Sequence, residues 1–303
     1  MEALLLESVS KSFGRLKAVD NLCACVQEGT IYGFLGPNGA GKTTTIRMIM
    51  DIIRPDSGSI SIFGDGAGKR NRSRTSYMPE ERGLYPKMKL KNVLKYFGSI
   101  KNVPSREIPV RTMQWLERVG LSEKADKKVE ELSRGMHQKL QFAVAAINEP
   151  DLFILDEPFA GLDPINQELF KDIILQLKEQ GKTIIFSTHV MHEAEKLCDY
   201  ILLINKGKIV IDGPLEQIKS ENITGAVTAR LEGDTGFIET LPIVTSVEKD
   251  GHNLDIVLKD NADPQQLLSE LMGRVKVLSF EIKQPSLHEI FIKLVGDSDE
   301  HDS

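Results

Sequence analysis

The chain has 303 residues, 41% hydrophobic and 27% charged, which is enough to bury a sizeable core without disulfides or structural metals. Its net charge of −6 disfavours a surface that binds nucleic acid or anionic lipid, because both of these partners bind to clusters of Lys and Arg. Three cysteines without metal-type spacing favour a reducing, cytosolic compartment. At about 150 residues per domain, the length predicts one large and one small domain.

The amino terminus predicts neither a signal peptide nor a membrane anchor. Residues 1–7 lack a basic segment, a long apolar segment and a small-residue cleavage site. The apolar runs 184–186 and 201–204 are of strand length, well below the ~20 residues that cross a bilayer. Any role at a membrane is therefore expected to depend on a partner protein.

Residues 1–218 alternate short β-rich runs with longer helical ones, which predicts a layered α/β domain with a largely parallel sheet. Buried strands are expected at 30–35, 152–155 and 183–187. From about residue 85 to residue 148 strand patterns give way to helical spacing of apolar residues. A helical insertion within the α/β domain is therefore predicted.

Residues 222–295 predict a separate small α+β domain. Its expected elements are strands 226–231, 244–249, 254–258 and 275–282, with helices near 236–240 and at 264–272. Asp250-Gly251 between two alternating runs is a hairpin signal. The resulting β-α-β-β-α-β order is typical of a ferredoxin-like arrangement. An amphipathic helix at 287–294 and a disordered acidic tail at 296–303 are expected to follow.

A phosphate-binding motif follows the first buried strand. It is Gly36-Pro37-Asn38-Gly39-Ala40-Gly41-Lys42-Thr43, which fits G-x-x-x-x-G-K-[ST], and it leads through Thr44 into a helical run to residue 53. Glycines let backbone N–H groups face phosphate oxygens, Lys42 supplies a cation, and Thr43 offers a hydroxyl to Mg²⁺. An ordinary Gly-rich turn would not demand Lys-Thr at this spacing. The segment therefore predicts binding of ATP or GTP.

Two carboxylates follow the apolar strand 152–155. Asp156 is expected to hold Mg²⁺ through its waters, while Glu157 is expected to orient and deprotonate an attacking water. In isolation such a pair could serve as turn or cap acids, but a nearby phosphate-binding motif favours the catalytic interpretation.

At this point residues 4–215 resemble the ABC ATPase superfamily. Leu132-Ser133-Arg134-Gly135-Met136-His137-Gln138-Lys139 is similar to the family's signature, usually L-S-G-G-Q followed by Q-[RK]. The resemblance implies that the Ser133 hydroxyl and the Gly135 N–H contact the γ-phosphate of an ATP bound by the opposite subunit. Arg134 and Met136 depart from the pattern, but neither position supplies those atoms.

Two further matches concern hydrolysis. Residues 160–163 resemble the D-loop, and His189 resembles the switch histidine, which implies a bridge between γ-phosphate, water and Glu157. His189-x-x-His192 also resembles a metal pair, although no third ligand lies near in the sequence.

Two more matches lie at the edges of the expected nucleotide site. Phe13 stands where the family places an aromatic side chain for adenine stacking, with core packing as the alternative. Glu80 stands where the Q-loop usually has glutamine, and its carboxylate can still bind Mg²⁺. The following residues 84–88 then either couple the site to a membrane partner or pack the helical insertion on the sheet.

The resemblance implies an ATPase with ATP and Mg²⁺ as cofactors, working as a dimer with two ATP molecules between its subunits. A single cassette with an accessory domain resembles the ABC-2-type drug, sodium or polysaccharide exporters, whose ATPase pairs with an integral membrane permease and lies on the inner face of the cell membrane. The alternative is a soluble ABC-type ATPase acting on ribosomes or DNA, but no fused cassette, long coil or basic tract appears. The transported substance cannot be read from a chain that lacks the permease.

Overall fold

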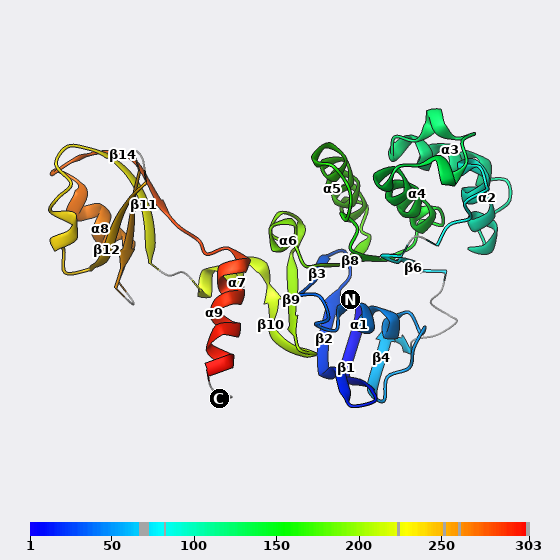
Figure 1. The fold of residues 1–303 in the computed structure, drawn as a ribbon, viewed down its shortest axis with the longest axis horizontal. Helices are drawn as coiled ribbons and strands as arrows, with labels where there is room; N and C mark the ends of the chain where they lie inside the picture. Colours follow the sequence, from blue (N-terminus) through cyan, green and yellow to red (C-terminus); the bar gives the residue numbers. More distant parts are fainter. Residues whose placement is uncertain (67–72, 82, 223–224, 251–252, 260–261, 301–303) are drawn as a thin grey trace. The chain divides into compact units, whose positions relative to one another are not determined.

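The computed structural model describes residues 1–66, 73–81, 83–222, 225–250, 253–259 and 262–300. The chain divides into two compact units, Met1–Pro214 and Leu215–Ser303. The division falls before the expected boundary at residue 218, because helix α7 (Leu215–Glu221) groups with the second unit (Figure 1).

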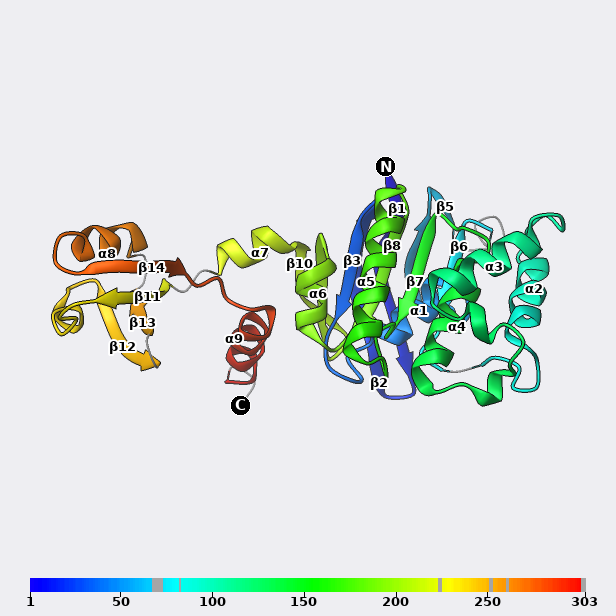
Figure 2. The same ribbon diagram turned by 90° about the horizontal axis from the view of Figure 1, so that it is seen from above.

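The first unit contains two sheets, seen from a second side in Figure 2. A four-stranded sheet has the order β2-β1-β4-β5, from β1 (Glu2–Phe13), β2 (Leu16–Gln27), β4 (Ser57–Ile62) and β5 (Asp65–Gly66). A six-stranded sheet has the order β10-β9-β3-β8-β7-β6, from β3 (Ile31–Leu35), β6 (Thr75–Met78), β7 (Leu152–Asp156), β8 (Thr183–Thr188), β9 (Tyr200–Asn205) and β10 (Lys208–Pro214). All its neighbours are parallel except β10, which confirms the predicted parallel sheet.

One hydrophobic core joins the two sheets. It includes Leu4 and Leu22 from the smaller sheet, Phe34 and Ile154 from the larger one, and Ile46 from α1 (Lys42–Ile49), all fully buried. Helix α1 is shorter than the expected run to residue 53, because the chain turns at Asp51 in a left-handed conformation. Helices α5 (Pro164–Glu179) and α6 (Met191–Leu197) follow β7 and β8.

The expected insertion is helical, consisting of α2 (Leu90–Ile100), α3 (Ile108–Arg118) and α4 (Arg134–Ala146) with two 3₁₀ turns, η2 (Ser122–Lys124) and η3 (Val129–Glu131). Trp115 and Phe142 meet in its core with ring centroids 6.2 Å apart.

The second unit has the antiparallel order β12-β13-β11-β14, from β11 (Ala226–Glu232), β12 (Val244–Asp250), β13 (Asn253–Leu258) and β14 (Lys276–Ile282). Helix α8 (Pro264–Leu271) covers the core, but the first expected helix is only the 3₁₀ turn η4 (Ile238–Thr240). The strand order is that of the ferredoxin-like arrangement. Asp250 pairs with Asn253, while Gly251 of the predicted turn lies outside the described residues.

Helix α9 (Leu287–Glu300) continues beyond the expected end at residue 294. Residues 301–303 of the predicted disordered tail lie outside the described part, and the disorder of 296–303 stays a prediction. Ser286 and Glu289 cap α9, with the Ser286 N–H donating to the Glu289 carboxylate at 2.7 Å and the Glu289 N–H donating to the Ser286 hydroxyl at 3.2 Å. Once nucleated, a helix gains one hydrogen bond for each residue added.

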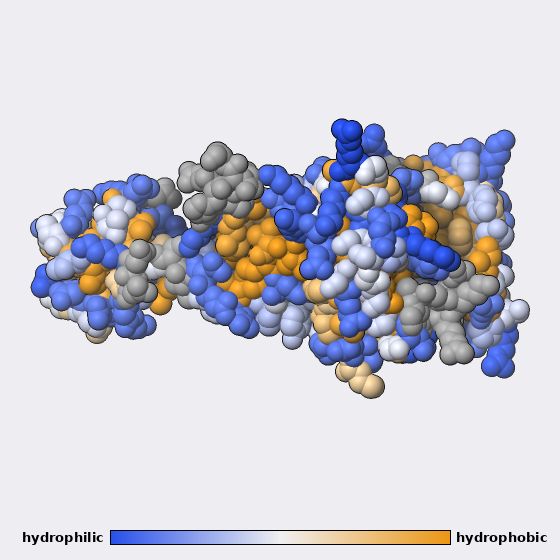
Figure 3. All heavy atoms as spheres, turned by 90° about the horizontal axis from the view of Figure 1, so that it is seen from below, coloured by the Kyte–Doolittle hydropathy of each residue, from blue (hydrophilic) through white to orange (hydrophobic). Residues whose placement is uncertain are grey.

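The surface of the molecule mixes polar and apolar side chains. On the face drawn in Figure 3, hydrophobic areas of different sizes lie among hydrophilic residues. Among the residues that the structure describes, no helix combines the length and apolar character needed to cross a membrane.

Lys101, at the end of α2, ties the helical insertion to the larger sheet. Its ammonium donates to the Ser76 hydroxyl of β6 at 2.6 Å and to the carbonyls of Val144 and Ala145 at 2.8 and 3.0 Å. These carbonyls belong to the last turn of α4, where a cation is favoured. Burial nevertheless lowers the pKa of Lys101 to about 7 from the ordinary 10.5.

This shift predicts a pH dependence of stability. Between about pH 7 and 10.5 the unfolded chain holds a proton at Lys101 that the folded chain has released, so the free energy of unfolding rises with pH across this window. Replacing Lys101→Met removes that contribution while other groups titrate unchanged. Denaturant unfolding of both proteins at several pH values checks this, and parallel stability curves would contradict it.

Candidate active site

Four segments meet at one edge of the larger sheet because their strands are parallel neighbours. Strands β3, β8, β7 and β6 lie side by side and end together, with Leu35 opposite Thr188 and Met78 opposite Leu155. The phosphate-binding motif, His189, Glu157 and Glu80 follow these strands in turn. Residues far apart in the sequence are thereby brought together, as expected at the carboxyl edge of an α/β sheet.

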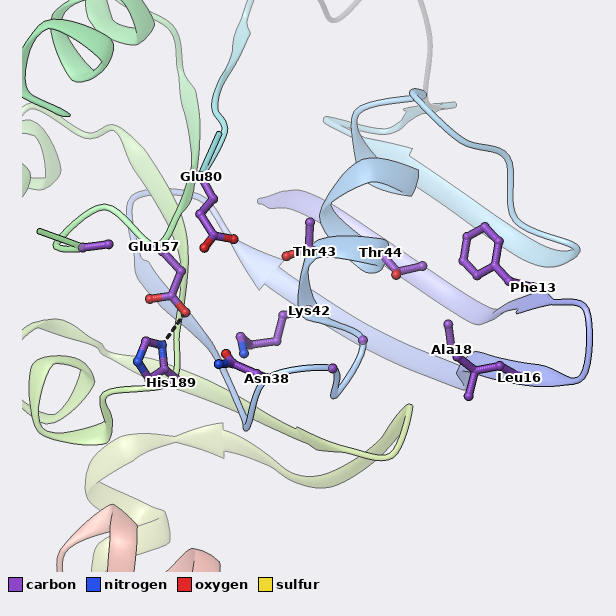
Figure 4. A pocket seen from close by; sticks show the side chains of 13 residues that line it. Phe13, Leu16, Ala18, Asn38, Lys42, Thr43, Thr44, Glu80, Glu157 and His189 are labelled. Atoms are coloured by element: carbon purple, nitrogen blue, oxygen red, sulfur yellow. Dashed lines mark hydrogen bonds and ion pairs between the residues drawn. The ribbon is translucent and has the colours of Figure 1, made fainter. Parts of the chain in front are cut away.

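These segments surround an open pocket of about 470 Å³. It is lined by Phe13, Leu16, Ala18, Asn38, Gly39, Gly41, Lys42, Thr43, Thr44, Glu80, Glu157, Ala160 and His189. Figure 4 shows Phe13, Leu16 and Ala18 at one end and Glu157, His189 and Glu80 at the other, with Lys42 and Thr43 between them. The pocket therefore has an apolar end and a charged end.

The phosphate-binding loop requires glycine at two positions. Gly36 and Gly41 have φ angles of +146° and +113°, and a Cβ there would lie 2.1 Å from the Ile204 carbonyl oxygen and 2.5 Å from that of Ala18. The loop curls around its own cation, because the Lys42 ammonium donates to the carbonyls of Gly36 at 2.7 Å and Pro37 at 3.0 Å. Burial lowers the pKa of Lys42, against the opposite effect of the carboxylates of Glu157, Asp156 and Glu80.

The predicted cofactor-binding residues of this loop fall into two groups. Asn38, Gly39, Gly41, Lys42, Thr43 and Thr44 line the pocket. Gly36, Pro37 and Ala40 do not belong to its described lining; the first two hold Lys42 through their carbonyls, and Ala40 is buried in the core.

Asp156 lies beneath the charged end of the pocket, where it is 1% exposed. Its carboxylate accepts hydrogen bonds from the Ser187 hydroxyl and, at 3.5 Å each, from the hydroxyls of Thr43 and Tyr77. Burial and the charge of Asp156 raise the pKa of Tyr77 to about 12, so that its phenol remains a donor. The three hydroxyls fix the carboxylate of Asp156 beside Thr43, and both residues are expected to bind Mg²⁺.

Glu157 adopts a left-handed backbone conformation with φ +48°. For a residue with a side chain this conformation costs about 1–2 kcal/mol. Its N–H donates to the carbonyl and hydroxyl oxygens of Ser187, both at 3.2 Å. Its carboxylate lies 2.8 Å from Nδ1 of His189, which brings together the two predicted catalytic residues. His192 lies instead 3.8 Å from Glu195, so the two histidines pair with different carboxylates.

Phe13 is 51% exposed, so the alternative of core packing is wrong. It pairs with Leu16 across the turn between β1 and β2, and Leu16 is 67% exposed. Sequence reasoning missed Leu16 and Ala18, although a short turn between two apolar residues (Phe13-Gly14-Arg15-Leu16) was the available signal. Together these residues form an apolar platform suited to stacking a base.

The signature residues lie outside the described lining of this pocket. Ser133 caps α4, its hydroxyl accepting from the Met136 N–H at 3.3 Å. A Cβ at Gly135 would meet the Gly161 carbonyl oxygen of the D-loop at 3.4 Å. Arg134 is exposed, as expected for a solvated side chain.

Sequence reasoning placed Gln138 in the signature motif without a role and missed Gln141, the second buried glutamine of α4. Gln138 binds the carbonyls of Glu157 and Pro158, and Gln141 binds those of Pro79 and Glu81. The available signal for Gln141 was an amide side chain directly before the apolar run 142–146.

These residues fit a nucleoside triphosphate with a divalent cation. The loop between β3 and α1 presents a cation and hydroxyl groups, which suit phosphate. Thr43 and Asp156 offer two oxygen ligands in contact, and Glu80 faces the same space (Figure 4). Hydroxyl and carboxylate oxygens are what Mg²⁺ prefers.

Comparison with known proteins agrees with this geometry. Residues 19–160 match the family described as ABC transporter, and residues 213–295 match the C-terminal domain described as ATP-binding protein DrrA1-3-like. The chain is 40% identical to the uncharacterized ABC transporter ATP-binding protein YhaQ of Bacillus subtilis, covering 97% of this chain and 98% of that protein. It is 36% identical to the Nod factor export ATP-binding protein I of Rhizobium sp. (strain N33), covering 97% of each.

Solved structures show the same cassette. An ATP-binding subunit of an ABC transporter is 29% identical, with a TM-score of 0.68 over 72% of this chain and 92% of that one. A dimeric ATP-binding cassette bound to ADP and phosphate shares the fold, with 23% identity and a TM-score of 0.65 over 70% of this chain and 98% of that one. This chain belongs to the ATP-binding proteins of the ABC transporter family and is an ATPase.

Proposed function

We propose that this chain is the ATP-hydrolysing subunit of an exporter, acting as a dimer that closes over two ATP molecules and drives a separate membrane-spanning permease. The observation that carries the proposal is the meeting of Lys42, Glu157 and His189 in one pocket. A relative over nearly the whole chain is named for Nod factor export, which supports an exporter. The matched family and relatives favour this function over an ATPase acting on ribosomes or DNA.

The charged end of the pocket is suited to hydrolysis. Glu157 would take a proton from the attacking water, and His189 would hold the Glu157 carboxylate and contact the γ-phosphate. Lys42 would bind phosphate oxygens. Thr43, Asp156 and Glu80 would hold Mg²⁺, which when bound supplies positive charge to the phosphate oxygens.

The position of the signature residues supports a shared site. Ser133 is exposed at the start of α4, and it lies outside the described lining of the chain's own pocket. A hydroxyl and free N–H groups at a helix start attract phosphate. In a head-to-tail dimer, Ser133 and Gly135 would therefore meet the γ-phosphate bound by the other subunit.

The exposed aromatic residues after the Q-loop support docking of a permease. Tyr85 and Tyr96 are 46% and 41% exposed, and their rings pack edge to face with centroids 5.3 Å apart. Exposed aromatic side chains are typical of protein interfaces. Such docking would place the chain at the cytoplasmic face of the cell membrane.

Replacing Glu157→Gln tests the catalytic role and the dimer together. The amide keeps the shape of the side chain but cannot accept the proton, so turnover is expected to fall by about 10²–10⁴-fold. ATP should then accumulate in a stable dimer, measured by size-exclusion chromatography with light scattering. The exposed Glu179→Gln is the control. Rapid hydrolysis by a monomeric Glu157→Gln protein would refute the assignment.

Replacing Glu80→Gln tests its role in holding Mg²⁺. Because an amide oxygen binds a hard cation more weakly than a carboxylate, half-maximal hydrolysis should need roughly tenfold more Mg²⁺. Titration of ATPase activity with Mg²⁺ measures the shift. The adjacent Glu81→Gln changes the same group where its side chain is exposed, so an equal shift in both variants would argue against a direct role.

Co-purification tests the permease surface. Changing Tyr85 and Tyr96 together to serine removes both rings and should lower the amount of subunit recovered with its permease from solubilised membranes by roughly tenfold. The exposed Ile52→Ser is a matched control. ATP hydrolysis by the isolated chain should be retained. Undiminished recovery of the double variant would exclude this surface.

A further inference from the structure

Helix α4 carries two buried amide side chains on one face, one turn apart. Gln138 and Gln141 are 2% and 4% exposed. Each donates from its Nε2 to two backbone carbonyls of a functional loop. A buried amide that satisfies two carbonyls at once fixes the direction of both peptide groups.

Gln138 holds the strained turn at Glu157. Its Nε2 lies 3.1 Å from the Glu157 carbonyl oxygen and 3.2 Å from that of Pro158. On the other side, Ser187 accepts the N–H of Glu157. Both backbone groups of this left-handed residue are therefore fixed, and a strained conformation persists only where its surroundings determine it. The carboxylate is aimed at His189 as a result.

Gln141 does the same for the loop that carries Glu80. Its Nε2 lies 3.3 Å from the Pro79 carbonyl oxygen and 2.9 Å from that of Glu81, so it grips the chain on both sides of Glu80. The Glu80 side chain points into the pocket between these two anchored peptide groups (Figure 4).

The same helix begins at Ser133. Residues 138 to 146 of α4 are buried, so a displacement of this helix would carry both glutamines with it. We propose that Gln138 and Gln141 are positioning residues that transmit the state of the Ser133 end of α4 to Glu157 and Glu80. This inference rests on the proposed function, in which the opposite subunit's ATP binds at Ser133. A nucleotide in one pocket would thereby set the two carboxylates of the other.

Replacing Gln138→Met keeps the length of the side chain and removes its donors. We expect kcat to fall by roughly 10–100-fold, as for a small misplacement of a catalytic group, while the dissociation constant for a fluorescent ATP analogue changes by less than about twofold. Gln176→Met, at an exposed glutamine of α5, is the control. Unchanged kcat in folded Gln138→Met protein, checked by its unfolding midpoint, would overturn the role.

Replacing Gln138→Glu adds a readout that a packing defect would not show. An ionised carboxylate repels the two carbonyls, whereas its protonated form regains one donor. The ratio of its kcat to that of the unchanged protein should therefore rise as pH falls from about 8 to about 6. A ratio independent of pH would contradict donation by Gln138.

Gln141→Met should act on the other loop. It is expected to raise the Mg²⁺ concentration for half-maximal hydrolysis, as Glu80→Gln does, with a smaller change in kcat than Gln138→Met. Equal effects of both methionine variants on kcat and on Mg²⁺ dependence would indicate a general loosening of α4. They would contradict separate roles for Gln138 at Glu157 and Gln141 at Glu80.

Combining Gln138→Met with Ser133→Ala tests transmission along the helix. If Ser133 acts through Gln138, the kcat of the double variant should be no lower than that of the less active single variant. Losses that multiply would show that the two residues act independently. If the Glu157→Gln protein forms no ATP-bound dimer, the proposed function is excluded. If it dimerises but the kcat losses of Ser133→Ala and Gln138→Met multiply in the double variant, only the present inference is excluded.

Discussion

Parallel pairing of β3, β8, β7 and β6 is the constraint on which the rest of the molecule depends. In a parallel sheet every strand ends at the same edge, so four loops separated by up to half the chain must open into one space. These strands are buried on both faces, and a shift of one strand by one residue would exchange the side chains that pack on each face. The packing therefore fixes the strand register and, with it, the relative positions of the loops. The pocket is thus a consequence of strand order, with Glu157 and His189 directly after their strands and Glu80 and Lys42 a few residues further on.

The strand ends do not by themselves aim the side chains. Glu157 adopts a left-handed conformation, and glycines of the phosphate loop turn where a Cβ would strike a neighbouring carbonyl. Such local strain persists because surrounding hydrogen bonds determine it, here from Ser187 on one side and from α4 on the other. The helical insertion therefore holds two of the loops that form the pocket.

The two units have separate hydrophobic cores. The first contains the whole described pocket, and its likeness to solved cassettes covers 72% of the chain. The second has its own core and matches a C-terminal domain found with ATP-binding proteins. Its four-stranded antiparallel sheet follows the ferredoxin-like order, so it can fold around its own apolar face.

The sequence predicted the motifs, the parallel sheet, the helical insertion and the strand order of the second unit. These features could be predicted because residue spacing and hydrophobic periodicity are local properties of the sequence. The sequence likewise predicted Lys42, Asp156, Glu157 and His189, since each follows a recognisable strand or motif. Only the tertiary structure decided that Phe13 is exposed beside Leu16, that α9 continues to Glu300, and that Gln138 and Gln141 hold the loops carrying Glu157 and Glu80. Those contacts join residues about 20 to 60 positions apart, and no local pattern records which carbonyl a buried amide will meet.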